Sequence, residues 1–273
     1  MIRTITQSLT QKVEKKYRFA IHAAFYGAIL FLHSGGFIPF ENLRLYFAML
    51  FVTGFSVILV HYPNVTYKNI FMAVLLPMNL ALGGTLALLF FPNISLIFKL
   101  SAIVAFSFLD YVILLINNVF LVIEDREEVI PLYRVAVTWS LILQIIVLIP
   151  LVASVYKFNV SSFYQAAAVA VLSFFYSLYQ IWVTRYDKDA KNAGVAERIF
   201  LSLIVFFFVF AGVIGVSFVP SEPFLKALFT SSIAMFGLSY VSAYLKNEIN
   251  KKFIFQYAFI TMFFLVLMLI FRP

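Results

Sequence analysis

Asp110 is the residue of this chain whose type and position point most directly to chemistry. It lies near the centre of the apolar run 97–123. A carboxylate at that depth in a membrane helix is costly, so such a residue marks an ion or proton pathway by default. At 100° per residue, Asn117 and Glu124 fall on the same helix face. This polar stripe predicts cation binding or proton relay. The structural alternative is a protonated Asp110 that hydrogen-bonds a neighbouring helix, with Asn117 holding helices together.

Two amides are expected at a similar depth in other apolar runs. Asn79 lies between Pro77 and a pair of glycines. A proline frees a backbone carbonyl and bends the helix, and interrupted helices near the midplane are typical of transporter sites. Gln144 is the third strongly polar group near mid-membrane. We expect Asp110, Asn79 and Gln144 to form one buried, ligand-binding polar cluster, with Asn117 beside it.

An acidic stretch with one arginine follows the stripe and is the second chemical candidate: Glu124, Asp125, Glu127, Glu128 and Arg134. The acids precede the next apolar run, where they favour the dipole of that helix, and the arginine one turn inside can pair with a glutamate. The functional alternative is an interfacial acidic cluster that binds a divalent cation or a lipid head group.

Catalytic residues and metal ligands are not assigned. His22 and His33 lie about 16 Å apart along one helix, which is too far to share a metal, and His61 belongs to the next run. These histidines are expected to be hydrogen-bonded or interfacial. The chain has no cysteine, and HExxH, P-loop and serine-nucleophile motifs are absent. An enzyme is therefore not the favoured interpretation, and any cofactor stays unknown.

The elements that position these residues are long apolar runs. The sequence is 63% hydrophobic and 12% charged, against about 25% charged in a typical soluble domain. So much apolar surface cannot be hidden in a core of this size, whereas lipid can cover it. The net charge of +8 is carried in short segments between the runs. Nucleic-acid binding would need a continuous basic stripe on a soluble domain, so it is not expected.

Nine runs reach the length of about 20 residues that a spanning helix needs. The sequence predicts an all-α, polytopic integral membrane protein with helices at 18–38, 44–61, 69–91, 97–123, 130–156, 161–184, 198–219, 223–245 and 252–271. With a cytoplasmic N-terminus and an outside C-terminus, only five of the 20 Lys and Arg residues lie outside: Arg44, Lys99, Lys157, Lys226 and Arg272. The positive-inside rule favours that orientation. Short outer turns predict that the helices form hairpins.

Two segments are expected from this pattern. Residues 1–17 are expected to form a basic, amphipathic cytoplasmic segment that lies on an anionic membrane surface. Residues 18–273 are expected to form a single transmembrane helical domain. We expect the protein to lie in the cell membrane, specifically in a bacterial cytoplasmic membrane. The bilayer is the expected partner, with other membrane subunits or further copies of the chain as additional ones.

Three functions remain open from the sequence. The favoured one is transport or permeation of a small solute or ion through a mid-membrane polar site. The second is a non-catalytic scaffold or assembly subunit whose phenylalanine-rich faces pack against other membrane proteins. The third is a membrane-embedded enzyme that acts on a lipid-linked substrate at the cytoplasmic interface, where the acidic cluster lies.

Overall fold

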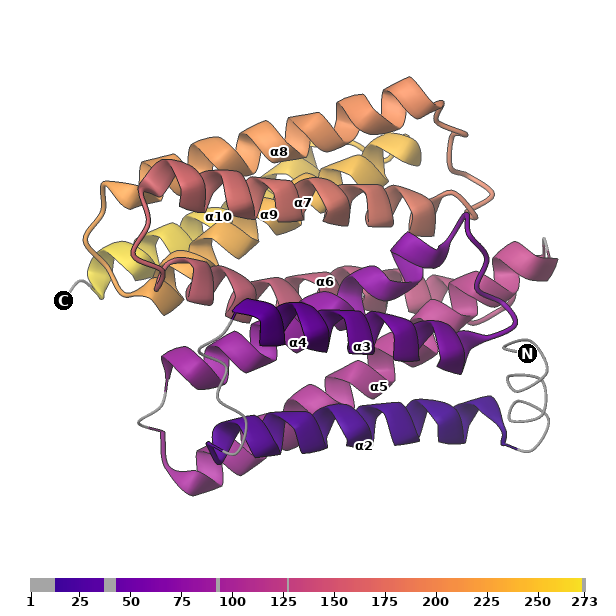
Figure 1. The fold of residues 1–273 in the computed structure, drawn as a ribbon. Helices are drawn as coiled ribbons and strands as arrows, with labels where there is room; N and C mark the ends of the chain where they lie inside the picture. Colours follow the sequence, from indigo (N-terminus) through magenta and orange to yellow (C-terminus); the bar gives the residue numbers. More distant parts are fainter. Residues whose placement is uncertain (1–12, 37–42, 92–93, 127, 272–273) are drawn as a thin grey trace. The chain divides into compact units, whose positions relative to one another are not determined.

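The structure, a computed structural model, describes residues 13–36, 43–91, 94–126 and 128–271. Within these ranges the regular elements are nine α-helices (Figure 1). In chain order they are α2 (Lys15–Ser34), α3 (Leu43–His61), α4 (Ile70–Phe90), α5 (Leu96–Arg126), α6 (Tyr133–Val155), α7 (Ser162–Thr184), α8 (Val195–Ser217), α9 (Pro223–Leu245) and α10 (Lys251–Ile270). The expectation of an all-α chain is therefore confirmed for the described residues.

Seven of the described helices, α4 to α10, are long and apolar enough to cross a membrane. The described apolar stretch of α3, Leu45–His61, is shorter, and α2 begins with Lys15, Lys16 and Arg18. A helix can cross a membrane because its backbone N–H and C=O groups bond to each other and need no partner from lipid. Seven such apolar helices in one chain are consistent with a multi-pass membrane protein.

The predicted runs and the observed helices agree to within a few residues. The helix α9 has the predicted bounds, and α4 covers all but the ends of the run 69–91. The helix α5, with 31 residues, begins one residue earlier and ends three residues later than the predicted run 97–123. Its length of about 46 Å exceeds the roughly 30 Å hydrocarbon core of a bilayer. Most of the predicted basic N-terminal segment, residues 1–12, lies outside the described residues.

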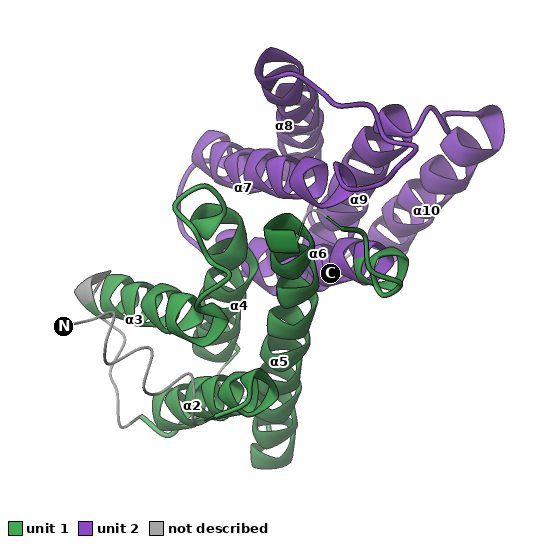
Figure 2. Cartoon of the chain, turned by 90° about the vertical axis from the view of Figure 1, so that its right-hand side faces the viewer, with its two compact units in different colours: residues 1–136 green, residues 137–273 purple. Residues whose placement is uncertain are grey.

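The chain divides into two compact units between Ala136 and Val137 (Figure 2). In the first unit, α2 packs along α5 and also contacts α3 and α4, while α4 contacts both α3 and α5. Phe19, Val57 and Leu114, from three of these helices, are buried against one another. The pairing of α2 with α5 joins elements far apart in the sequence. The expected single transmembrane domain stays a prediction.

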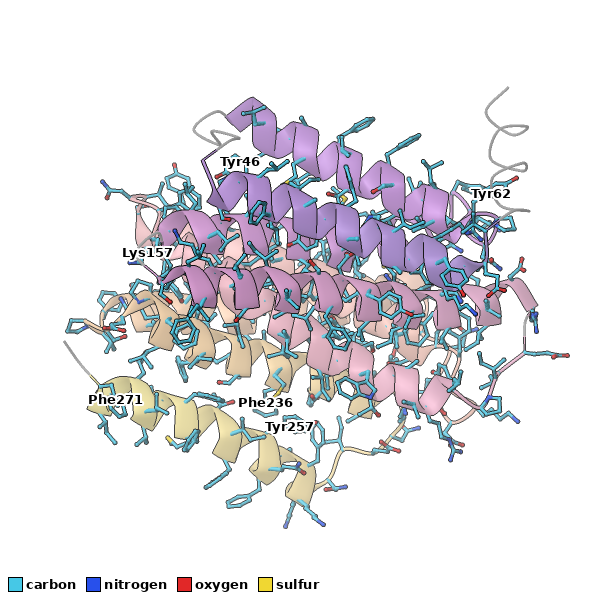
Figure 3. The ribbon with its side chains drawn as sticks, turned by 90° about the horizontal axis from the view of Figure 1, so that it is seen from below. Tyr46, Tyr62, Lys157, Phe236, Tyr257 and Phe271 are labelled. Atoms are coloured by element: carbon cyan, nitrogen blue, oxygen red, sulfur yellow. The ribbon has the colours of Figure 1, made fainter. Side chains whose placement is uncertain are left out.

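In the second unit, α7, α8 and α9 pack against one another, and α10 lies against α9. Phe236 of α9 stacks on Tyr257 of α10 with ring centroids 6.2 Å apart, and both residues are labelled in Figure 3. Met268 is the one buried residue that α10 contributes within its described length. This helix therefore presents most of its apolar side chains outward from its unit.

Two glycines allow α2 to approach its neighbours closely. A Cβ atom on Gly27 would overlap the Ser107 hydroxyl of α5, and one on Gly84 of α4 would overlap the Tyr26 hydroxyl. With that space left open, the Tyr26 hydroxyl donates a hydrogen bond to the Leu80 carbonyl at 2.9 Å. The glycine pair of α4, whose role the sequence left general, thus includes a residue that makes room for α2.

Pro77 lies inside α4 and has a structural partner in α5. Proline lacks an N–H, so the carbonyl four residues earlier, that of Ala73, loses its helical donor. The side-chain amide of Asn117 donates to this carbonyl at 2.9 Å. Asn117 is fully buried, and a buried carbonyl without a donor is costly. Asn117 therefore links α5 to the interrupted backbone of α4.

Asn117→Ala is expected to lower the free energy of unfolding by about 1 to 2 kcal/mol, because the Ala73 carbonyl loses its donor. In a Pro77→Ala background the loss is expected to be smaller, because position 77 then supplies an N–H to that carbonyl. The four proteins are compared by reversible unfolding in mixed micelles. Equal losses in both backgrounds would show that Asn117 stabilises something other than this carbonyl.

Candidate functional site

The predicted polar stripe of α5 points into the first unit and contacts three different elements. Asp110 contacts α2, Asn117 contacts the backbone of α4, and Glu124 accepts a hydrogen bond from Asn69, just before α4. The one-face placement follows from the helical period. The different partners mean that the stripe is a line of contacts along α5 within this unit.

The central contact is a buried pair between two ionisable groups. His22 Nδ1 lies 2.7 Å from Asp110 Oδ2, and the two side chains are 2% and 1% exposed. The Nε2 atom of His22 is buried and has no hydrogen-bond partner among the described residues. A carboxyl group and an imidazole at hydrogen-bond distance share one proton without changing the net charge of the pair.

The predicted ligand cluster did not include His22. This residue was expected to be hydrogen-bonded or interfacial, like the other histidines. It is hydrogen-bonded, and its partner is Asp110, the carboxylate predicted to be at the centre of that cluster. The two residues are 88 positions apart, and no spacing rule connects the first predicted run with the fourth. Only the packing of α2 along α5 reveals the pair.

The end of the stripe near Glu124 holds a second, more solvent-accessible polar network. The Lys15 ammonium donates to Asn64 and also to Asn118, the latter at 3.2 Å. Asn64 in turn donates to the Asp125 carboxylate at 3.2 Å. These contacts join the start of α2, the turn between α3 and α4, and the end of α5. Burial lowers the pKa of the Lys15 ammonium, and the nearby Arg18 lowers it further.

The predicted acidic cluster is drawn into that network only in part. Glu124 and Asp125 accept hydrogen bonds from Asn69 and Asn64, whereas Glu128 and Arg134 lie at exposed positions. Glu127 lies outside the described residues. Among those that are described, no three His, Cys, Asp or Glu residues lie close enough to hold a metal ion.

The predicted cluster of Asn79, Asp110 and Gln144 stays a prediction, because its first two members belong to the first unit and Gln144 to the second. The Asn79 side-chain nitrogen is buried and has no hydrogen-bond partner among the described residues. A buried amide donor without a partner is unusual in a folded protein. Asn79 therefore stays a candidate for contact with a ligand.

Gln144 belongs to a polar chain inside the second unit. Its side-chain nitrogen donates to Gln180 at 2.6 Å, and Gln180 donates to Ser242 at 2.8 Å. Thr184, one turn after Gln180, lies 3.3 Å from the same Ser242 hydroxyl. Interhelical hydrogen bonds of this kind hold membrane helices together. Here they connect α6, α7 and α9.

His61, the last residue of α3, lies within hydrogen-bond distance of two backbone carbonyls. Its ring nitrogens lie 3.0 Å from the Val57 carbonyl and 3.1 Å from the Leu114 carbonyl. Its ring also packs against Phe19 of α2 at a centroid distance of 5.0 Å. His61 thus contacts the two helices that carry the His22–Asp110 pair, and its hydrogen-bonded state agrees with the expectation for the histidines.

Lys15→Met is expected to lower the free energy of unfolding by about 1 kcal/mol, because Asn64 and Asn118 lose a half-buried charged donor. Lys16→Met is the matched control: Lys16 is exposed, forms an ion pair with the exposed Glu14 at 2.8 Å and lies over the exposed Tyr17 ring, and such surface contacts stabilise little. Both variants are unfolded under the same conditions. An equal effect of the two substitutions would contradict a structural role for the Lys15 network.

Comparison with known proteins finds no matching family model, no matching curated protein and no matching solved structure.

Proposed function

We propose that this membrane protein permits protons to pass, and that the His22–Asp110 pair is its proton-exchanging group. The observation that carries the proposal is the burial of both ionisable side chains at a nitrogen–oxygen distance of 2.7 Å. Neutral amides and hydroxyls are sufficient to hold membrane helices together, and they cost less free energy to bury than a carboxyl group. A titratable pair adds the ability to accept and release a proton.

The stripe of α5 supports a route from this pair toward one end of the helix. Asn117 lies about 10 Å from Asp110 along the helix axis, and Glu124 lies about twice as far. Beyond them, Lys15 and Asp125 belong to the polar network at the end of the first unit. Water that enters along these groups would find hydrogen-bond partners at intervals down to Asp110.

The helix α4 supplies the feature that suits a moving part. Pro77 interrupts its hydrogen bonding, and Asn79 presents an unpartnered donor one half-turn later. A helix already interrupted near its middle needs less free energy to bend. We propose that a small change in α4 exposes the pair to one side or the other. Gln144 would join this site if the predicted cluster of three forms.

Purified wild-type protein in liposomes is expected to move protons when a potassium diffusion potential is imposed, as reported by a trapped pH-sensitive dye. Asp110→Asn is expected to lower the initial rate at least about tenfold, because an amide still accepts a hydrogen bond from His22 but cannot carry the proton. Asp189→Asn is the matched control, since Asp189 is exposed in a loop. Normal flux through Asp110→Asn, or wild-type flux no greater than that of empty liposomes, would contradict the proposal.

We also propose that the chain crosses the membrane nine times as hairpins plus a final helix, with its N-terminus in the cytoplasm. The support is the distribution of charge: only five of the 20 Lys and Arg residues then lie outside. A single missed or additional span would reverse every later segment. It would then place the basic residues around Lys188 and Lys191 on the outer side.

The lack of native cysteines makes this orientation directly testable. In intact cells, a membrane-impermeant maleimide is expected to label Asn159→Cys, which follows α6, and to leave Asn192→Cys, which precedes α8, unlabelled. Both positions are exposed, so both variants should react after the cells are opened. Labelling of Asn192→Cys in intact cells would reverse the orientation.

A further inference from the structure

A groove with a volume of about 740 Å³ lies within the second unit, walled by α6, α9 and α10. This volume falls in the range of about 300–1,000 Å³ that is usual for small-molecule sites. Its wall changes character along α9, from charged to neutral polar to apolar. None of the proton chemistry proposed for the first unit depends on it.

The charged end of the groove lies at the turn between α9 and α10. Lys246, Glu248 and Lys252 line it. Lys246 also pairs with Asp187 at 2.5 Å, so its charge is partly balanced, whereas Lys252 and Glu248 are exposed. Asn250 caps the start of the 20-residue helix α10, whose N-terminus favours an anion. Among its lining residues, this end therefore offers two ammonium groups and one carboxylate.

The middle of the groove carries neutral hydrogen-bonding groups. Ser242 and Ser239 lie one and two turns before Lys246 along α9, and Gln180 of α7 faces the same space. Gln180 and Ser242 bond to each other. Ser239 is 3% exposed, and its hydroxyl has no hydrogen-bond partner among the described residues. A buried hydroxyl of this kind can donate to an acceptor that occupies the groove.

The far part of the groove is apolar. Ile142 of α6, Met235 of α9 and Ile260 of α10 line it. Met235 lies about 16 Å from Lys246 along the axis of α9, which is about half the thickness of a bilayer core. Tyr257 lines the groove between the polar and apolar parts, where it stacks on Phe236, as labelled in Figure 3.

We propose that this groove binds one glycerophospholipid whose head group carries both a phosphate and a primary ammonium. The phosphate lies by Lys246 and Lys252, and the ammonium by Glu248. An ester carbonyl accepts a hydrogen bond from Ser239. An acyl chain runs along the apolar wall. The order of the three parts of such a lipid matches the order of the three parts of the groove, and basic pockets between helices at a membrane surface are known to hold lipid head groups.

The first test compares two neighbouring lysines. The protein is purified from nanodiscs that contain equal phosphatidylethanolamine and phosphatidylglycerol, and retained lipid is counted by native mass spectrometry. The wild type is expected to retain one phosphatidylethanolamine. Lys252→Gln is expected to lower that retention up to about fivefold, while Lys251→Gln, next to it but outside the groove lining, leaves it unchanged. Equal retention in both variants, a preference for phosphatidylglycerol, or no retained lipid would overturn the proposal.

The second test uses two buried serines of α9. Ser239→Ala is expected to weaken retention about fivefold, the effect of one neutral hydrogen bond. Ser231→Ala is the matched control: its hydroxyl is also buried without a partner among the described residues, but Ser231 does not line the groove. Both changes remove only an oxygen atom, so the fold is expected to persist, which a thermal melt checks. Retention that falls equally in both variants, or in neither, would contradict the contact with Ser239.

Discussion

The cost of burying polar groups in an apolar surrounding is the constraint on which this structure depends. A carboxyl group, an interrupted backbone and a row of amides all lie among helices built largely from apolar side chains. Each needs a partner, because lipid offers none. In the first unit α5 meets that need along one face: Asp110 contacts His22, and Asn117 contacts the carbonyl freed by Pro77.

The close packing of α2 follows from the same constraint. The His22–Asp110 contact requires α2 to approach α5, and Gly27 leaves the room for Ser107 in that approach. Gly84 does the same for the Tyr26 hydroxyl against α4. Small residues at helix contacts are the usual solution in membranes. The chain has only ten glycines, compared with 34 phenylalanines. Two of these glycines lie where α2 meets its neighbouring helices.

The second unit solves the problem differently. Gln144, Gln180 and Ser242 form a chain of hydrogen bonds across three helices and bring no charge into the interior. Its lysines and acids lie instead near the ends of its helices and in the loops between them, as in the pair between Lys246 and Asp187. The buried hydroxyl of Ser239 faces the groove rather than a protein acceptor. Our two proposals accordingly place ion chemistry in the first unit and lipid binding in the second.

The sequence predicted the helices well because a spanning length and an apolar composition are local properties. It also predicted that Asn117 and Glu124 share a face with Asp110, since that follows from the helical period. The partners were not predictable, because His22 and Asp110 are 88 residues apart. Likewise, a proline indicates that a carbonyl is free but not that Asn117 will bind it. Contacts between distant helices depend on packing that no local pattern encodes.

The protonation of His22 is the measurement that tests the central claim most directly. The chain contains three histidines, so ¹⁵N-histidine solid-state NMR of the protein in bilayers can resolve each ring. Our account predicts that the His22 signal changes between neutral and protonated forms as pH varies, and that Asp110→Asn shifts or abolishes this change. A His22 ring that keeps one protonation state at every pH, in both wild type and variant, would contradict a proton-exchanging pair.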